Sequence, residues 1–312
     1  MPRRPLSAAL AAEVVMADGG LSTLLEAAGV RPTGPMWTGE VLATRPEAVG
    51  AAHEAALAAG ARVVLTAGYQ ISRRGAVASG RPEGVADRLL VEANRVALAA
   101  RSRRRRDGWV AASIGPFGAA LADRSEYRGG YAATDDELRI FHRERLKVLA
   151  EAQHDPSTRV DLWWCETFPE GREIEGLADE LLVTVGTLDA DSAPELVVTM
   201  TVVADGRVPT GEPVDEALGP MLAADPNTPG GPVAVGVNCC GPGHVAPALQ
   251  RLARATPLPL VAKPNLAGSL GPTDGLVATW LDLRARLVGG CCGTGAAELR
   301  ALADELERHR PR

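Results

Sequence analysis

The sequence lacks several features that would point to common classes of protein. No apolar run approaches the roughly 20 residues needed to cross a bilayer, so no membrane-spanning segment is expected. Basic residues are not in excess: 33 Lys and Arg face 39 Asp and Glu, and the net charge is −6. The one basic run, Arg103 to Arg106, is interpreted as a solvated helix end. General nucleic-acid binding is therefore not expected.

Cysteine is scarce and unevenly placed. The chain has five: Cys165 and two adjacent pairs, Cys239-Cys240 and Cys291-Cys292. An odd number in such an arrangement is a poor disulfide framework. It fits metal or thiol chemistry in a reducing compartment better.

The N-terminus resembles a secretion signal only superficially. Two arginines precede an apolar stretch, but Glu13 interrupts it and Asp18-Gly19-Gly20 follows at once. This pattern predicts a short helix and then a first strand, in a cytoplasmic protein. A single domain is expected over 1–312, with 1–12 as an N-terminal extension and 309–312 as a C-terminal tail.

The sequence does contain a repeated unit of a short apolar strand followed by a helix. Such runs of Val, Leu and Ala predict strands that are buried on both faces. The predicted strands are 14–17, 62–66, 109–113, 162–165, 196–201, 234–238, 258–262 and 286–288. The predicted helices are 46–59, 82–101, 135–153, 174–187, 215–224, 244–255, 272–283 and 296–308.

Eight strand–helix units predict a (β/α)8 barrel of the TIM type, with a doubly wound open sheet as the alternative. Polar or glycine-rich segments follow nearly every predicted strand. A barrel gathers such segments on one rim, whereas an open sheet spreads them along a line. No dinucleotide fingerprint follows the first strand, because Asp18-Gly19-Gly20 lacks its spacing. The barrel is therefore favoured.

Three cysteines fall at strand ends that a barrel brings close together. Cys239 ends one predicted strand, and Cys291-Cys292 follow the next strand but one. Three thiolates with no histidine at any strand end favour zinc over magnesium or calcium. Three protein ligands also leave one tetrahedral position open, as in catalytic zinc sites.

Other residues compete for this role. Cys240 begins a Gly-Pro-Gly turn, whereas Cys239 directly ends an apolar run and is preferred. Cys165 lies in a Trp-Trp-Cys stretch and is expected to pack in the core. His244 fits a helix start better than a ligand position.

The charge of such a centre suggests its chemistry. Zn²⁺ with three thiolates has a formal charge of 2 − 3 = −1, which makes it a poor Lewis acid for carbonyl hydrolysis. It suits a fourth thiol, because zinc deprotonates a coordinating thiol. Alkyl transfer to sulfur is the reaction this predicts.

At this point the residues resemble a known family, the zinc-dependent homocysteine S-methyltransferases. The resemblance rests on Gly-Gly-Cys-Cys-Gly-Thr at 289–294 with Val-Asn-Cys at 237–239, and it runs from Asp18 across nearly the whole chain. The segments 113–118 and 125–129 look like the stand-alone branch that uses S-methylmethionine or S-adenosylmethionine. The betaine-using branch and the large cobalamin-dependent methionine synthases are less similar there.

The resemblance implies a function and a set of ligands. The enzyme would transfer a methyl group from a sulfonium donor to the zinc-bound thiolate of L-homocysteine, giving L-methionine. Zinc ligation by Cys239, Cys291 and Cys292 is implied. Asp18 and Glu166 are implied to hold the amino group of homocysteine, which fits two carboxylates at strand ends.

Several further residues are expected at the site. Backbone amides of Gly19-Gly20 or Thr66-Ala67 are candidates for the substrate carboxylate. Asn238 and Asn265 are candidates to hydrogen-bond the zinc-bound thiolates, and Asn265 is also a candidate substrate-binding residue. A cationic donor favours aromatic faces and carboxylates, and the candidates are Trp37, Tyr69, Glu126 and Tyr127.

The chain also departs from the family pattern. Lys263 stands where the family usually has an aromatic residue, Gly295-Ala296 replaces Thr-Pro, and the segment 266–286 looks short. These departures keep two alternatives open. One is another thiol or selenol acceptor, or betaine as the donor. The other is a non-catalytic zinc or thiol barrel that binds metabolites, in which Cys291-Cys292 could close as a disulfide.

Overall fold

The computed structural model describes residues 4–104, 107–265 and 275–309. Within them, eight parallel strands form one sheet in the order β1-β8-β7-β6-β5-β4-β3-β2. They are β1 Val15–Met16, β2 Val63–Leu65, β3 Trp109–Ile114, β4 Leu162–Phe168, β5 Glu195–Met200, β6 Pro232–Asn238, β7 Leu260–Lys263 and β8 Ala285–Val288. Backbone hydrogen bonds of 2.8 Å from Arg62 to Met16 and 2.9 Å from Asp18 to Val63 join the two outer strands. The sheet is therefore the predicted barrel.

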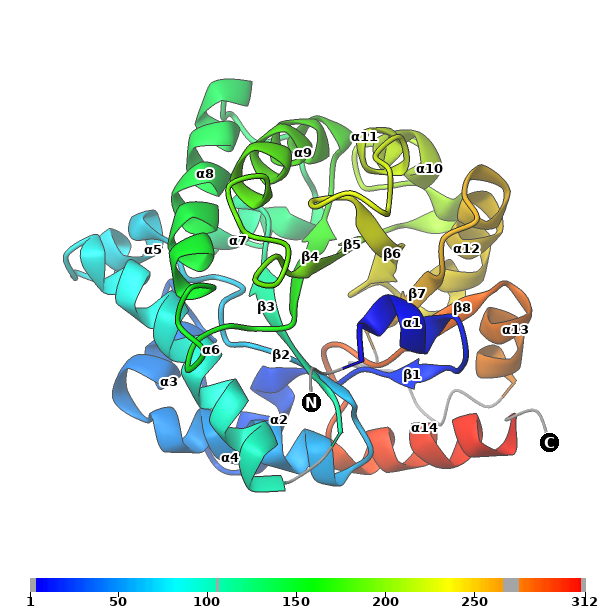
Figure 1. The fold of residues 1–312 in the computed structure, drawn as a ribbon, viewed down its shortest axis with the longest axis horizontal. Coiled ribbons are helices and arrows are strands. Elements are labelled where there is room, and N and C mark those ends of the chain that lie inside the picture. The colour runs from blue at the N-terminus through cyan, green and yellow to red at the C-terminus, as the bar shows by residue number, and fades with distance from the viewer. Residues whose placement is uncertain (1–3, 105–106, 266–274, 310–312) are drawn as a thin grey trace.

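Helices surround this barrel in a ring (Figure 1). The long ones are α4 Pro46–Ala58, α6 Gly84–Arg104, α8 Asp135–Ala152, α9 Gly171–Val185, α12 Pro242–Ala255 and α14 Ala296–Arg308. Shorter ones are α1 Leu6–Leu10, α2 Leu21–Ala27, α3 Thr38–Thr44, α5 Arg73–Ala78, α7 Phe117–Leu121, α10 Val214–Ala217, α11 Gly219–Leu222 and α13 Leu276–Asp282, with 3₁₀ turns η1 Ser125–Tyr127 and η2 Ala204–Gly206. None of the helices in the described ranges is long and apolar enough to span a bilayer.

The predicted elements differ from the observed ones in a few places. The predicted helix 215–224 is wrong, because it is split into α10 and α11 where Gly219-Pro220 interrupts the pattern. The short helices α2, α3, α5 and α7 were not predicted. The start of the predicted helix at Pro272 and most of the shortened segment lie outside the described residues.

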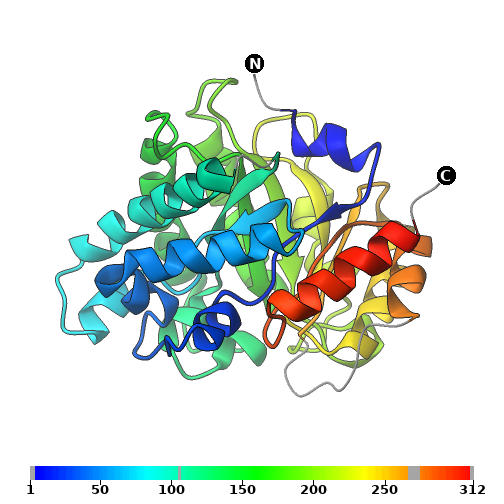
Figure 2. The ribbon, with the colours of Figure 1, turned by 90° about the horizontal axis from the view of Figure 1, so that it is seen from below.

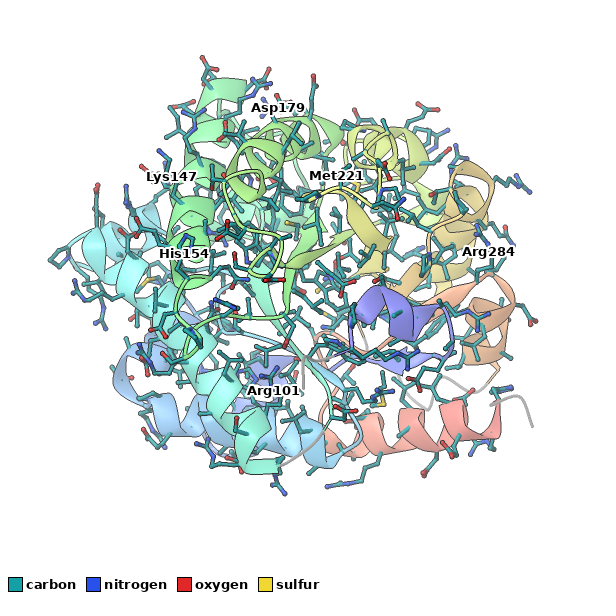
Figure 3. All side chains as sticks on the ribbon, viewed as in Figure 1. Arg101, Lys147, His154, Asp179, Met221 and Arg284 are labelled. Atoms are coloured by element: carbon teal, nitrogen blue, oxygen red, sulfur yellow. The ribbon has the colours of Figure 1, made fainter. Side chains whose placement is uncertain are left out.

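Successive side chains on each strand alternate between two buried environments, the barrel interior and the layer facing the helices. On β4, Leu162 and Trp164 face the barrel interior, while Trp163 and Cys165 pack toward the helices. This two-residue period on doubly buried strands explains their continuous apolar runs. Charged side chains lie on the outside of the helical ring, Lys147 and Asp179 among them (Figure 3).

Helix α1 closes one end of the barrel (Figure 2). Leu6 and Leu10 are fully buried and belong to the same cluster as the interior strand residues. The Glu195 carboxylate fixes the helix start by accepting hydrogen bonds from the amides of Leu6 and Ser7. The segment predicted as an extension therefore contributes to the barrel core.

A Leu6→Ala variant should unfold more easily because it leaves a cavity at this closed end. We expect a loss of about 2–4 kcal/mol in the free energy of unfolding, measured by urea denaturation. Leu182→Ala on α9 is the matched control, since Leu182 is 65% exposed. A loss at Leu6 no larger than at Leu182 would show that α1 does not seal the barrel.

Candidate metal centre and substrate site

Three cysteine sulfurs meet at the carboxyl ends of β6 and β8. The Sγ atoms of Cys239, Cys291 and Cys292 all lie within 4.8 Å of one another. The pair Cys239 and Cys292 is 3.7 Å apart. Cys239 has a φ of 50°, so the chain turns sharply as β6 ends and aims this thiol toward the other two.

This geometry fits a tetrahedral zinc ion. With Zn–S bonds of about 2.3 Å, two sulfurs on a tetrahedron are about 3.8 Å apart. The observed 3.7 Å between Cys239 and Cys292 matches that edge. The donor set is three soft thiols, which selects zinc among common biological divalent ions. Hydrogen bonds from Cys239 and Cys291 also lower the pKa of the Cys292 thiol.

The other two cysteines are not part of this cluster. Cys240 is 4% exposed and packs in the hydrophobic core, where burial raises the pKa of its thiol to about 12. Cys165 is fully buried in the same core, and burial raises the pKa of its thiol too. Buried neutral thiols of this kind behave as small apolar side chains.

Glycines let the loops after β1 and β8 pass against each other. A Cβ on Gly20 would lie 2.8 Å from the carbonyl oxygen of Cys291, and one on Gly19 would lie 2.2 Å from that of Thr294. The Gly20 amide donates to Thr294 O, and the Gly290 amide donates to Asp18 O. These contacts set the position of the cysteine pair relative to Asp18.

Two carboxylates are buried beside the thiols. Asp18 is 4% exposed and its Oδ2 accepts a 2.8 Å hydrogen bond from the Leu65 amide. Glu166 is 7% exposed and accepts hydrogen bonds from Ser113 Oγ at 2.5 Å and Asn238 Nδ2 at 3.3 Å. Burial raises the pKa of Asp18 to about 6 and that of Glu166 to about 7, with the Lys263 ammonium opposing both shifts.

The Asn238 side chain hydrogen-bonds Thr167 and Glu166 at the end of β4, not a cysteine thiol. Asn238 was predicted to hydrogen-bond the thiolates. Its Oδ1 accepts from the Thr167 amide at 2.8 Å, and its Nδ2 donates to Thr167 Oγ1 at 2.7 Å as well as to Glu166. Asn265 follows β7, and its amide donates to Cys240 O at 2.7 Å. A substrate contact for Asn265 remains a prediction.

Two of the four residues proposed for the donor, Tyr127 and Tyr69, lie near the thiols. The Tyr127 hydroxyl is 3.3 Å from Cys239 Sγ. The Tyr69 hydroxyl is buried, and its burial together with the charges of Glu126 and Cys239 raises its pKa. Glu126 is 7% exposed, and none of the described residues hydrogen-bonds its Oε2. Burial raises the pKa of Glu126.

Two glycines, Gly115 just after β3 and Gly118 in the first turn of α7, make room for these residues. A Cβ on Gly115 would lie 2.7 Å from the Tyr69 ring, and one on Gly118 would lie 2.6 Å from the Glu126 amide. The Gly-Pro-Phe-Gly segment therefore shapes the wall beside the thiols. Any larger residue at either position would displace a proposed donor contact.

Trp37 lies in a different setting. It is 38% exposed and lines a surface hollow of 380 Å³ together with Glu26, Gly29 and Arg31. Its φ of 48° at the start of α3 is unusual for a tryptophan. A donor contact for Trp37 stays a prediction.

Sequence reasoning missed a polar layer inside the barrel. The interior side of the strands is apolar up to Ala111, Trp164 and Val261. Two residues further along the same strands stand Ser113, Glu166 and Lys263, all buried. Only Glu166 had been singled out as a site residue, with Lys263 noted as a departure. Continuing the two-residue period one step beyond each apolar run could have found all three.

A buried network behind the β3 loop was also missed. Glu173, at the start of α9, accepts hydrogen bonds from the Phe117 amide and from Tyr131 Oη at 2.9 Å. His142 Nε2 lies 2.8 Å from the same carboxylate. Arg145 donates to the carbonyls of Gly115 and Tyr69. The network fixes both loops that carry the proposed donor residues.

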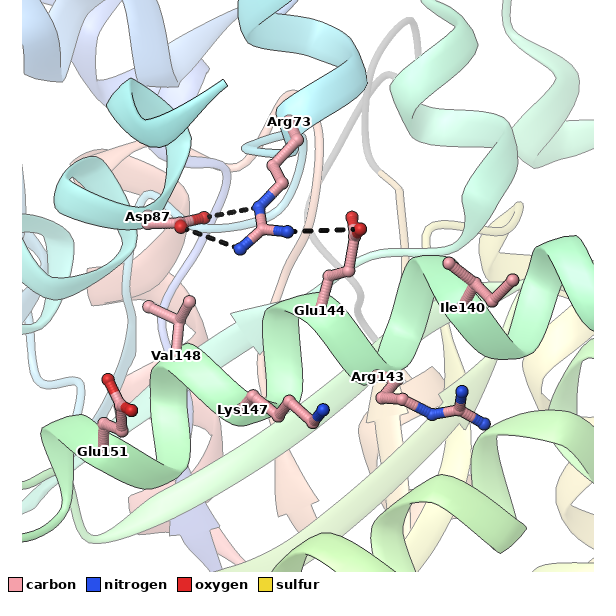
Figure 4. A pocket seen from close by; sticks show the side chains of 8 residues that line it. All are labelled: Arg73, Asp87, Ile140, Arg143, Glu144, Lys147, Val148 and Glu151. Carbon is pink, nitrogen blue, oxygen red and sulfur yellow. Dashed lines mark hydrogen bonds and ion pairs between the residues drawn. The ribbon is translucent and has the colours of Figure 1, made fainter. Parts of the chain in front are cut away.

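A larger surface hollow lies outside the barrel and does not resemble a substrate site. It measures 450 Å³ and lies between α8 and the α5–α6 pair (Figure 4). Arg73 there is already paired with both Asp87 at 3.0 Å and Glu144 at 3.2 Å. The charge of Arg73 is therefore already balanced by two carboxylates.

Comparison with known proteins gives a consistent match. A family model described as homocysteine S-methyltransferase matches residues 15–306. The homocysteine S-methyltransferase of Escherichia coli (strain K12) is 32% identical over 310 residues, covering 93% of this chain and 94% of that protein. The selenocysteine Se-methyltransferase of Brassica oleracea var. italica is 30% identical over 325 residues, covering 94% and 89%.

Solved structures agree. The homocysteine methyltransferase MmuM from Escherichia coli in its metallated form superposes with a TM-score of 0.84 at 32% identity, covering 97% of this chain and 100% of that one. Its oxidized form gives a TM-score of 0.83. With the barrel and its thiol cluster, these matches over nearly the full length place the chain in the homocysteine S-methyltransferase family, and it is a methyltransferase of that kind.

Proposed function

We propose that this enzyme transfers a methyl group from a sulfonium compound, S-methylmethionine or S-adenosylmethionine, to the thiolate of L-homocysteine, giving L-methionine. The observation that carries the proposal is the convergence of three thiols beside two buried carboxylates. Cys239, Cys291 and Cys292 would hold zinc, and zinc bound there would keep the sulfur of homocysteine deprotonated and electron-rich at neutral pH.

The protein orients the acceptor through its amino-acid end. Glu166, with the charge of Asp18 nearby, favours the ammonium group of homocysteine. Ser113 and Asn238 hold the Glu166 carboxylate in place through its two oxygens. Such positioning supplies much of the rate, because two bound reactants behave as one molecule.

The methyl group moves by direct displacement. A sulfur lone pair of homocysteine forms the new C–S bond while the C–S bond of the donor sulfonium breaks. The electrons of the broken bond return to the donor sulfur, which leaves as a neutral thioether. No proton moves in this step, so no general base is needed at the reacting atoms.

The donor is proposed to lie against Tyr69, Tyr127 and Glu126. A sulfonium carries a positive charge, which aromatic faces and carboxylates stabilise in a desolvated site. The Glu126 Oε2 atom is buried and has no partner among the described residues. An ionised carboxylate in that state is stabilised by a cationic ligand.

Glu126→Gln tests the donor position. We expect the KM for the sulfonium donor to rise about tenfold, since one charge–charge contact is lost, while the dissociation constant for homocysteine stays unchanged. Initial rates at varied donor, with homocysteine binding by calorimetry, measure both. Glu47→Gln, on the exposed start of α4, is the matched control. If only the dissociation constant for homocysteine rose, Glu126 would belong to the acceptor site instead.

The proposal as a whole is tested by methionine formation. Zinc-loaded enzyme is supplied with homocysteine and, in turn, S-methylmethionine, S-adenosylmethionine and betaine. Turnover with one sulfonium names the donor, and turnover with betaine alone would reject a sulfonium donor. No turnover, despite one zinc per chain, would reject the proposed reaction.

A selenol acceptor is a second candidate. The relative from Brassica oleracea, 30% identical to this chain, is named for methyl transfer to selenocysteine. Zinc held by the same three cysteines would also bind a selenolate, which is a softer metal ligand than a thiolate. Selenocysteine in the same assay, compared with homocysteine by kcat/KM, decides which acceptor is preferred.

A further inference from the structure

Lys263 lies inside the acceptor site. It is 3% exposed, and its Nζ atom is 3.5 Å from Asp18 Oδ1. It ends β7, the strand between the two that carry the cysteines. The Cys239 amide donates to the Lys263 carbonyl, and the Cys291 amide donates to the next carbonyl, Pro264 O.

The direction of this side chain follows from the strand. Val261 faces the barrel interior, so the residue two positions later faces the same way. The ammonium of Lys263 therefore enters the polar layer that contains Glu166. The Asp18 carboxylate oxygen 3.5 Å away gives this buried ammonium an ionised partner. The side chain is a buried cation.

The two carboxylates are consequently not equivalent. Asp18 faces Lys263 with an oxygen that accepts no hydrogen bond from the described residues. Glu166 receives its two hydrogen bonds from the neutral groups of Ser113 and Asn238, and among the described residues no cationic group forms an ion pair with it as Lys263 does with Asp18. Within this pair, Glu166 carries the charge that is left for a substrate ammonium.

The substrate carboxylate needs a positive partner. Of the four backbone amides first considered for it, two are already used, because Gly20 donates to Thr294 O and Thr66 donates to Ala111 O, and the amides of Gly19 and Ala67 are neutral donors. Lys263 is a charged donor in the same polar layer. It is also one of only two lysines among the 33 basic residues, the other being Lys147. A lysine ammonium is compact and can contact two carboxylates at once.

We propose that Lys263 binds the carboxylate of the acceptor amino acid, with Asp18 as its fixed counter-ion, and that Glu166 holds the acceptor ammonium. This assignment rests on the proposed function and deepens it. The site then matches a zwitterion with one charge of each sign. It selects amino-acid thiols over thiols that lack either charged group.

Trimmed acceptors test the assignment on the zinc-loaded enzyme. 3-Mercaptopropylamine is homocysteine without its carboxylate, and 4-mercaptobutanoate is homocysteine without its ammonium. In Lys263→Met, homocysteine binding by calorimetry should weaken about 30-fold, the size expected for one lost charged hydrogen bond. Binding of 3-mercaptopropylamine should change less than threefold. Glu166→Gln should show the reverse selectivity, losing affinity for 3-mercaptopropylamine but not for 4-mercaptobutanoate.

Controls separate this role from a structural one. Lys147→Met removes the other lysine, which is exposed on α8, and should change neither affinity. Because Lys263→Met leaves Asp18 buried and unpaired, the double variant Lys263→Met/Asp18→Asn removes both charges. With one zinc per chain, this double variant should also bind homocysteine more weakly while its affinity for 3-mercaptopropylamine changes little.

Two results would overturn the assignment. Equal weakening for homocysteine and 3-mercaptopropylamine would show that Lys263 acts on the site in general. Tighter homocysteine binding by Lys263→Met would show that the lysine competes with the substrate ammonium. These are binding measurements, so they stand apart from the donor assay. Homocysteine that binds as described but is never methylated would fault the proposed reaction alone.

Discussion

Cys291→Ala is expected to lose both zinc and methyl transfer to homocysteine. It removes one of three sulfurs that lie within 4.8 Å of one another. Loss of a residue that only supports a metal ligand costs 10- to 100-fold, so loss of a ligand should lower kcat/KM by more than about 10³-fold. Zinc per chain by mass spectrometry and methionine formation measure the two effects.

Cys240→Ala is the matched control for this variant. Cys240 adjoins Cys239 in sequence but packs in the core, so its loss should leave one zinc per chain. Cys239→Ala should behave like Cys291→Ala. If Cys240→Ala lost zinc and Cys239→Ala kept it, the ligand assignment would be wrong.

Glu166→Gln is expected to lower kcat/KM for homocysteine about 100-fold, mostly through KM. Glutamine keeps the shape of the side chain but removes the charge that faces the substrate ammonium, and a charged hydrogen bond of this kind contributes up to about 3 kcal/mol. Initial rates at varied homocysteine measure the effect. Glu175→Gln, on the exposed side of α9, is the matched control and should leave kcat/KM unchanged.

The same variant should change the pH profile. Burial raises the pKa of Glu166 to about 7, against the opposing charge of Lys263. Below that pH the carboxyl becomes neutral and no longer attracts an ammonium, so wild-type kcat/KM should fall as the pH drops through about 7. Glu166→Gln should lack this fall. An unchanged acid limb in the variant would assign the titration to another group.

The barrel could be predicted from the sequence because its signal is local and repeated. Each strand is buried on both faces and reads as a short apolar run, and strand ends in a barrel share one rim. That rule alone places Cys239 and Cys291 together. The helix predicted at 215–224 is wrong because apolar spacing outweighed the break at Gly219-Pro220.

The details of the site could not be predicted because they depend on register. Lys263 pairs with Asn238 across β6 and β7, and this pairing decides what each side chain meets inside the barrel. No local pattern reveals that Asn238 binds Thr167, or that Lys263 reaches Asp18 from far along the chain. The polar residues can be identified from the sequence, but their hydrogen-bond partners depend on the register of the closed barrel.

Because α1 closes one end of the barrel, it limits where substrates can enter and products can leave. Leu6 and Leu10 fill one end of the barrel, so we expect substrates and products to pass through the opposite end, where the carboxyl ends of the strands lie. Two substrates must enter, and two products must leave, by the same mouth. A product still bound at this mouth would exclude the next pair of substrates.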